Sequence, residues 1–261
     1  VTWAVDENVS ASGARMEGPD ATSHRITIRN CIIAEGLHDA SHSKGPHSKG
    51  SLVHDFCRDI AVVGNLYAHN VDRNPYFKAF TTGVIANNVI YNAQDRGVKL
   101  DYSEDQWTAA GFSPENGIVS VVGNVMLYGV DTDADAPFVE SKGDAYLEDN
   151  LALDLAGQPA KMTSGSVKIL VDRPIWVQGL SAFPSSETVD RVVASAGARP
   201  LDRDAVDQRI VDEFVARQGR VIDSQEDVGG YPIHDIVRRP IEVPATGREA
   251  WLATLGDGLV R

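Results

Sequence analysis

Short apolar runs that flank an asparagine recur between residues 25 and 153. Each repeat has a β-branched or aliphatic run, then the asparagine, then a second apolar run. The asparagines in question are Asn30, Asn65, Asn88, Asn124 and Asn150. Runs this short predict strands rather than helices, and their recurrence indicates a structural unit that stacks on its neighbours. The steps between the asparagines are unequal, which predicts a coil of fixed minimum length that carries insertions of varying length.

This pattern predicts an all-β fold of the parallel β-helix (solenoid) type. Each coil would supply short strands to the next coil, because one coil alone cannot bury its inner face. Asparagine at a corner between strands tolerates a left-handed backbone and can bond to the asparagine one coil away. An antiparallel sandwich is the alternative, but the two-residue Asn-Gly or Asp-Gly hairpins typical of it are almost absent between these runs.

The character of the sequence changes after about residue 155. Residues 168–171 and 175–177 are expected to be the final strands. Apolar residues at helical spacing predict a helix over 187–196 and a second helix that Asp202 or Asp204 caps. We therefore expect a partial β-helix over residues 1–180 that carries the site. Residues 181–261 are expected to form a C-terminal helical and extended cap packed on the coils, with Trp251 pinning its far end.

Composition narrows the class of protein only loosely. The 261-residue chain has a formal net charge of −13, which argues against nucleic acid as a partner. No apolar run approaches the roughly 18 residues of a membrane span, so no membrane partner is expected. The protein is expected to be a monomer. The chain opens at Val1 inside a β-rich stretch, which we interpret as the later part of a longer protein. Cys31 and Cys57 lie beside strand-like runs and are expected to be buried, unpaired thiols, with one disulfide as the alternative.

A cluster of three histidines and two lysines between residues 38 and 52 is the first candidate for chemistry. Lys44, His47 and Lys49 belong to it. Imidazoles are good ligands for zinc or copper, but the cluster has neither an HxxxH helix motif nor a cysteine ligand. A solvated basic loop and an anion-binding loop are the other interpretations, since lysine charges and glycine N–H groups suit a carboxylate.

Two further clusters flank this one. Arg73 and Lys78 lie one coil after it, so the two basic groups could be neighbours on one face. Asp6 and Glu7 lie upstream. Adjacent carboxylates are usually solvated, but opposite lysine and arginine they could instead hold calcium, a hard cation that prefers several oxygens.

Residues 3–92 resemble the catalytic half of a pectate lyase of polysaccharide lyase family one. The stretches 203–207 and 219–232 resemble the tail of bacterial pectate-lyase-like proteins. The resemblance implies a right-handed parallel β-helix, calcium-assisted β-elimination and a secreted or periplasmic location. The implied partner is an acidic (uronate) polysaccharide, with pectate or polygalacturonate as the first expectation.

The resemblance also implies roles for single residues. Arg73, followed by Pro75, matches an Arg-x-Pro motif whose arginine acts as the base. Lys49, before a short leucine-containing strand, matches a lysine that acts on the substrate, and Lys44 is its rival. Lys78 stands where the family has a second basic residue.

The metal ligands follow from the same comparison. Asp6 and Glu7 match the acidic strand that supplies calcium ligands, whereas Ser10 stands where the family has a further acidic residue. His47 is assigned to substrate binding together with Lys44 and Lys78.

The implied chemistry is physically coherent. The hydrogen at C5 of a galacturonate is α to a carboxylate, which calcium and Lys49 would neutralise while Arg73 removes the proton. Arginine has a pKa above about 12 and is a poor base unless its surroundings disfavour its charge. Arg73 could instead only stabilise charge, with a lysine or His47 taking the proton.

Two other classes of function stay open. A β-helix glycoside hydrolase needs converging carboxylates, and near Arg73 the sequence offers only Asp72 and Asp55. A non-catalytic carbohydrate-binding or adhesin-like scaffold needs no basic cluster. The discriminating question is whether Lys49, Arg73 and Lys78 face one groove.

Overall fold

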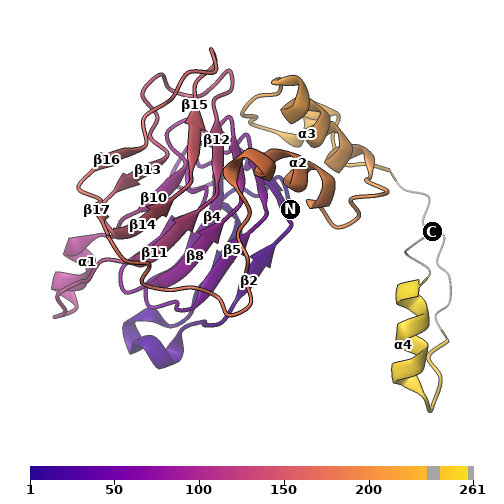
Figure 1. Ribbon diagram of the computed structural model, residues 1–261, viewed down its shortest axis with the longest axis horizontal. Helices are drawn as coiled ribbons and strands as arrows, with labels where there is room; N and C mark the ends of the chain where they lie inside the picture. Colours follow the sequence, from indigo (N-terminus) through magenta and orange to yellow (C-terminus); the bar gives the residue numbers. More distant parts are fainter. Residues whose placement is uncertain (234–241, 258–261) are drawn as a thin grey trace. The chain divides into compact units, whose positions relative to one another are not determined.

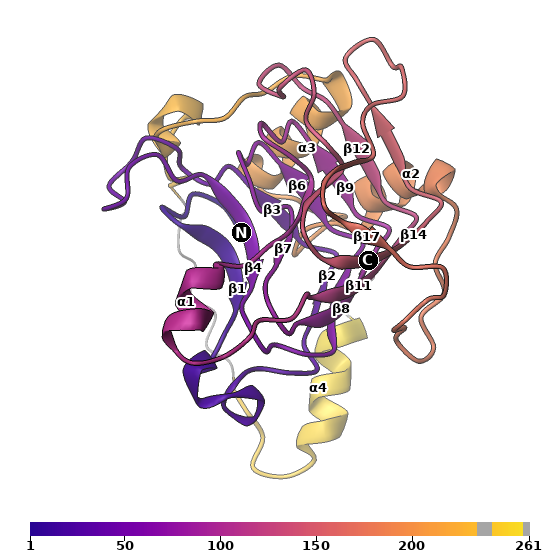
Figure 2. The same ribbon diagram turned by 90° about the vertical axis from the view of Figure 1, so that its left-hand side faces the viewer.

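The computed structural model describes residues 1–233 and 242–257. It divides into two compact units, Val1–Tyr231 and Pro232–Arg261. In the first unit the described residues form three sheets in which every pair of neighbouring strands is parallel (Figures 1 and 2). The parallel β-helix predicted from the asparagine repeat is therefore confirmed.

Successive strands visit the three sheets in turn, so each sheet holds one strand from each coil. The first sheet is β1 (Glu7–Ala11), β4 (Lys49–Val53), β7 (Tyr76–Phe77), β10 (Val98–Leu100), β13 (Val139–Ser141) and β16 (Thr163–Gly165). The second sheet is β2 (Thr27–Arg29), β5 (Ile60–Val63), β8 (Thr82–Ala86), β11 (Ile118–Val122), β14 (Asp144–Glu148) and β17 (Lys168–Ile169). The third sheet is β3 (Ile32–Ala34), β6 (Leu66–Ala68), β9 (Val89–Tyr91), β12 (Val125–Leu127) and β15 (Leu151–Leu153).

A ladder of buried asparagines joins the coils at the corner between the second and third sheets. Asn65 Nδ2 donates to Asn88 Oδ1 at 2.8 Å, Asn88 to Asn124 at 2.9 Å, and Asn124 to Asn150 at 2.9 Å. Each of these oxygens also accepts a backbone N–H, as Asn88 Oδ1 does from Asn65. The ladder satisfies polar groups that the corner would otherwise bury unpaired.

Asn30 does not belong to this ladder, contrary to the expectation from the repeat. The strand register places Cys31 beside Asn65, so that Asn30 is level with Gly64. Asn30 has φ +52° and Gly64 has φ +68°, the left-handed conformation that the residue before the ladder needs. The two roles expected of one asparagine are thus divided between two adjacent positions.

The interior of the coils is filled by apolar side chains from all three sheets. Tyr67, Phe77, Ile85 and Phe138 are fully buried there. Both cysteines are free thiols, as expected, but only Cys57 is buried in this core, whereas Cys31 is partly buried and packs against it.

Helices α2 (Ser185–Ser195) and α3 (Ala205–Ala216) pack on the outer face of the third sheet. Val192, Ile210 and Phe214 join the apolar residues of that face. The side chain of Asp204 caps α3 by accepting from two backbone N–H groups. Both expected helices therefore form, and their packing carries the first compact unit through to Tyr231 rather than ending it near residue 180.

Residues 175–177 do not form the predicted strand. Ile175, Trp176 and Leu180 instead pack against the outer face of the second sheet, on Ala61, Val84 and their neighbours. Their apolar pattern serves to cover a sheet rather than to extend one.

The remaining helical elements are short. They are the 3-10 turns η1 (Arg15–Glu17), η2 (Pro19–Ala21) and η3 (Gln225–Val228), and the α-helices α1 (Glu104–Ala109) and α4 (Arg248–Asp257). Trp251 lies in α4 in the second unit. None of the helices that the structure describes has the length and apolar character of a membrane span.

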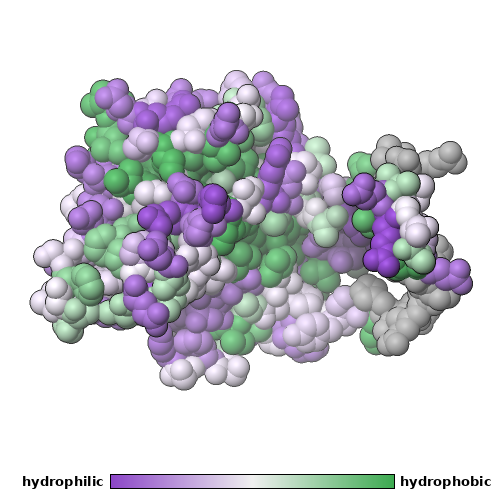
Figure 3. Space-filling view, turned by 90° about the horizontal axis from the view of Figure 1, so that it is seen from below, coloured by the Kyte–Doolittle hydropathy of each residue, from purple (hydrophilic) through white to green (hydrophobic). Residues whose placement is uncertain are grey.

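The distribution of hydrophilic and apolar residues on the surface of the coils does not by itself indicate a binding site. On the face seen in Figure 3, hydrophilic and apolar residues alternate in patches. Charged side chains on the first sheet are more informative.

Candidate active site

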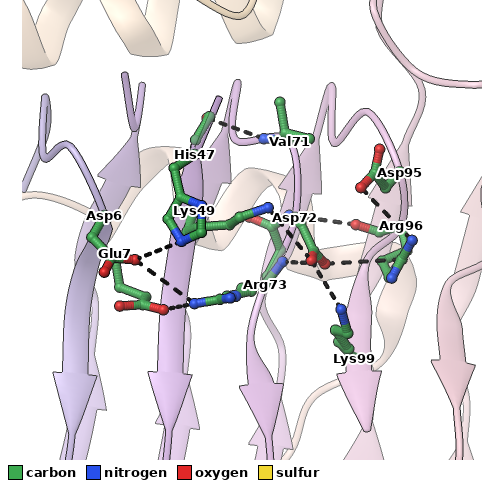
Figure 4. Close-up of polar contacts among 12 residues, drawn as sticks. Asp6, Glu7, His47, Lys49, Val71, Asp72, Arg73, Asp95, Arg96 and Lys99 are labelled. Atoms are coloured by element: carbon green, nitrogen blue, oxygen red, sulfur yellow. Dashed lines mark hydrogen bonds and ion pairs between the residues drawn. The ribbon is translucent and has the colours of Figure 1, made fainter. Parts of the chain in front are cut away.

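Four cations gather where the strands of the first sheet begin, and we call them the basic face: Lys49, Arg73, Arg96 and Lys99 (Figure 4). They come from three consecutive coils. Lys49 opens β4, Arg73 precedes β7, and Lys99 is the outward residue of β10, where Val98 and Leu100 point inward. Because neighbouring strands lie about 4.7–4.9 Å apart, the cations form a short column along the coils. Carboxylates alternate with them: Glu7 pairs with Arg73, Asp72 with the two lysines, and Glu140 with Arg96 at 2.6 Å.

Asp72 is the buried centre of this face. Its carboxylate, only 5% exposed, lies 3.1 Å from Lys99 Nζ, 3.7 Å from Lys49 Nζ and 3.9 Å from Arg96 Nε. Burial works against ionisation, but Lys99, Lys49 and Arg96 outweigh it and hold the pKa of Asp72 below its usual range. Asp72 is therefore an anion that positions the three cations.

Arg73 has the most unusual surroundings of the four. It has a left-handed backbone (φ +68°), and its guanidinium lies beside Glu7 and 3.8 Å from Asp6 Oδ1. Its Cζ is also 5.5 Å from the centre of the Tyr76 ring, a cation–π contact. Burial lowers the pKa of Arg73, although Asp6 and Tyr76 oppose this shift. Arg73 is thus closer to accepting a proton than an exposed arginine would be.

Asp6 also contacts the loop of residues 38–48, which contains His42 and His47 and which we call the histidine loop. Its Oδ1 lies 3.2 Å from His47 Nε2 and its Oδ2 lies 3.4 Å from His42 Nε2, while the two rings stack with centroids 4.1 Å apart. Burial lowers the pKa of His47. The charge of Asp6 opposes this shift, whereas Lys49, His42 and Lys44 lower the pKa further. His47 is therefore neutral at pH 7.

The residues present fit calcium poorly. Asp6 Oδ1 accepts no hydrogen bond from any described residue and has lone pairs to offer, whereas Glu7 Oε1 is in direct contact with the Arg73 guanidinium. However, two carboxylates supply at most four of the six to eight oxygens that calcium takes. The Arg73 guanidinium already lies against both, and the groups next to Asp6 are imidazole nitrogens rather than oxygens.

Lys78 does not join the basic face. It follows β7, and its Nζ lies 3.3 Å from Oδ2 of Asp55, a fully buried carboxylate that also binds Arg15 and His54. Trp107 of α1 donates to the same carboxylate. Lys78 therefore belongs to a second ionic cluster, at the opposite end of β7 from Arg73.

Lys44 lies in the exposed turn of the histidine loop, where its backbone N–H donates to His42 Nδ1 at 3.1 Å. Of the two rival lysines, only Lys49 enters the basic face. Arg73, Lys49, Asp6, Glu7 and His47 thus come together, whereas Lys44 and Lys78 lie at the margins.

Sequence reasoning missed Lys99 and Arg96, which complete the face. The one available signal was the alternation of Val98, Lys99 and Leu100, which marks Lys99 as the outward residue of a strand. No motif links it to Arg73, because the contact exists only through stacking of the coils.

Where substrate carboxylates replace the chain's own carboxylates as partners, such a face can bind successive positions of an extended polyanion, with a partly desolvated guanidinium among its cations. No family model matches the chain, and a search of curated proteins finds no match.

Proposed function

We propose that the protein is a polysaccharide lyase that cleaves an acidic polysaccharide, with polygalacturonate as the first candidate, by β-elimination. One observation carries the proposal: Lys49, Arg73 and Lys99 stand on consecutive coils of one sheet, with Arg73 desolvated between the other two. A stalk or adhesin has no need of such a cluster, and the resemblance of residues 3–92 to pectate lyases points to the same reaction.

In this proposal the uronate chain lies along the coils and across the basic face. Lys49 and Lys99 pair with the carboxylate at C6 of the reacting sugar, which makes its C5 hydrogen more acidic. Arg73 leaves Glu7 and gives its own proton to hydroxide from the solvent. The neutral guanidine then accepts the C5 proton, and the electrons of the C5–H bond form the C4–C5 double bond. The C4–O bond breaks, and the leaving oxygen takes a proton from water.

The exchange of partners at Arg73 is an essential part of the proposal. While Arg73 is paired with Glu7 and Asp6, both carboxylates favour its charged form. Substrate binding has to separate the guanidinium from them, because a base must lose its own proton before it can accept another. Calcium at Asp6 and Glu7 and a secreted or periplasmic location stay predictions, which the resemblance supports and the donor set of the site does not favour.

Hydrolysis is the second candidate, and one observation favours it. The pKa of Asp95 is raised, mainly by burial and by the charge of Asp72, whereas the pKa of Asp72 is lowered. Two neighbouring carboxylates with pKa values pushed apart are typical of a general acid and its ionised partner. Asp95 would then protonate the leaving oxygen.

The experiment separates these reactions by their products. The protein is incubated with polygalacturonate, alginate and a neutral glucan, with added calcium or with a chelator. We expect ultraviolet absorbance from an unsaturated uronate on a uronate polymer and none on the glucan. New reducing ends without absorbance, lost in Asp95→Asn, would support the hydrolase, and neither signal would refute both.

Lys99→Ala tests the geometry of the basic face, with Lys142→Ala as the matched control. Lys142 pairs with Glu104 beside α1 and has no contact with the basic face among the described residues. Loss of one charge-assisted contact to the substrate carboxylate is expected to cost about 1.5–3 kcal/mol, or roughly tenfold to a hundredfold in kcat/KM. An equal effect of the two variants would remove Lys99 from the site.

A further inference from the structure

The Asp6, His42 and His47 side chains form a cluster that the proposed reaction does not use as a unit. One atom from each lies within 4.8 Å of the others. From this geometry we infer that the cluster is a binding site for a borderline transition-metal ion, with Zn²⁺ as the reference ion, and is not a calcium site.

The spacing of the donor atoms supports this inference. Zinc bonds of about 2.0–2.2 Å to nitrogen and oxygen place two tetrahedral ligands about 3.3 Å apart. His47 Nε2 lies 3.2 Å from Asp6 Oδ1, and His42 Nε2 lies 3.4 Å from the other oxygen, Asp6 Oδ2. The rings of His42 and His47 are stacked with an interplanar angle of 5°, so one of them has to rotate before both Nε2 lone pairs point at one ion. After that rotation one ion can bind all three side chains.

The unmet bonding capacity of Asp6 is an independent observation. The Asp6 side chain is 43% exposed, but its Oδ1 is buried and accepts no hydrogen bond from any described residue, although His47 Nε2 lies 3.2 Å and Arg73 NH1 3.8 Å away. A buried anionic oxygen without a hydrogen bond is costly, and an ion would satisfy it. Figure 4 shows Asp6 between His47 and Arg73, at the edge of the basic face.

The donor chemistry selects the class of ion. Two imidazoles and one carboxylate suit zinc, cobalt, nickel or copper, whereas calcium prefers six to eight oxygens. A tetrahedral ion bound to three side chains keeps its fourth position for water or for an oxygen of a bound ligand.

Binding exchanges two existing interactions for bonds to the ion. His42 Nδ1 accepts from Lys44 N–H at 3.1 Å, so its ring proton is on Nε2. Coordination through Nε2 moves that proton to Nδ1 and ends the hydrogen bond to Lys44. The ion also replaces Arg73 as the partner of Asp6, from which Arg73 NH1 is 3.8 Å away. The net cost of these exchanges, together with the nearby positive charges, predicts a weaker site than a structural zinc finger.

The test is direct binding and does not depend on enzymatic activity. Calorimetric titration with Zn²⁺, and visible absorption of the Co²⁺-loaded protein, are measured on the whole chain. We expect one ion per chain in the wild type and a loss of affinity of at least tenfold in His42→Ala and in His47→Ala. His24→Ala removes an exposed imidazole that contacts Arg25, and it should leave binding unchanged.

Circular dichroism and the melting temperature without metal establish that each variant is folded, and Asp6→Asn gives a second test that keeps the side-chain volume. Equal binding by wild type, His42→Ala and His47→Ala would overturn the inference, because the ion would then bind elsewhere. Absence of Zn²⁺ binding at micromolar to submillimolar concentration would also overturn it. So would displacement of Zn²⁺ by an equal concentration of Ca²⁺.

Discussion

Asp72→Asn tests the buried anion at the centre of the basic face. The substitution keeps the shape of the side chain and removes the charge that faces Lys99, Lys49 and Arg96. With the anion gone, Lys49 and Lys99 remain close together without the carboxylate that neutralises them, whereas Arg96 keeps Glu140 at 2.6 Å. We therefore expect the folded state to lose free energy relative to the unfolded state.

The magnitude follows from the distances. Unit charges 3.1–3.9 Å apart attract by about 4–5 kcal/mol at an effective dielectric constant of 20. The cost of desolvating the charges offsets most of this attraction, and removal of one partner of a buried pair typically costs about 3–5 kcal/mol. Lys49, Lys99 and Arg96 are 13–20% exposed and regain some hydration, so we expect about 3 kcal/mol at pH 7.

The assay is urea denaturation of wild type and variant over a range of pH. The pKa of Asp72 is lowered in the folded state, so its stabilising effect is complete above the ordinary pKa of an aspartate. It disappears as the pH falls through the lowered value, because both proteins are then neutral at this position. The difference in the free energy of unfolding should therefore shrink in acid.

Asp95→Asn is the matched control, one coil away. The folded state raises the pKa of Asp95, so the charge of Asp95 destabilises the folded protein at neutral pH. Its removal should leave the stability unchanged or higher. A loss below about 1 kcal/mol in Asp72→Asn, or equal losses in both variants, would show that Asp72 does not stabilise the fold through its charge.

Two further predictions concern the scaffold. Asn88→Ala should lower the free energy of unfolding by about 2–4 kcal/mol, because it leaves N–H and C=O groups of neighbouring coils buried without partners. Asn150→Ala, at the partly buried end of the ladder, should cost less in the same denaturation assay, and equal costs would contradict this role of the ladder. Burial lowers the pKa of His69 to about 4. The unfolded chain thus takes up this proton first, and stability should fall by about 3 kcal/mol between pH 6.5 and 4. His69→Gln should flatten that part of the pH profile of unfolding, and an unchanged slope would contradict the assignment.

The coils themselves could be predicted from the sequence because their physical cause is local. Each coil needs short apolar strands and a polar residue at the corner that bonds to the next coil, and Asn65, Asn88 and Asn124 meet this need. The prediction that Asn30 joins the ladder was wrong by one position. Cys31 occupies the ladder position in the first coil, and its backbone N–H donates to Asn65 Oδ1. Local sequence shows that a corner exists but not which of two adjacent residues faces the neighbouring coil.

The site could be predicted only in part, because its contacts cross coils. Lys49, Arg73, Asp6 and Glu7 stood out as compact clusters, and the structure brings them together. Lys99 and Arg96 lie 20 or more residues further along and meet Asp72 only by stacking. Lys78 looked equivalent to its neighbours in sequence. However, the buried carboxylate of Asp55 draws it into another cluster, and nothing in the residues around Lys78 indicates this.

In the proposed β-elimination Arg73 accepts the C5 proton, and the pH profile of lyase activity is the most direct test of this role. The measurement is kcat/KM for release of unsaturated uronate from polygalacturonate between pH 6 and 11, for wild type, Arg73→Lys and Arg73→Ala. Circular dichroism confirms the fold of each. The wild-type rate should rise with pH, as expected for a base that must lose its proton. Arg73→Ala should lose at least a hundredfold, and Arg73→Lys should keep partial activity with its rise at lower pH, since lysine has the lower pKa. An Arg73→Ala rate within threefold of wild type, or the same pH profile in all three proteins, would contradict the claim.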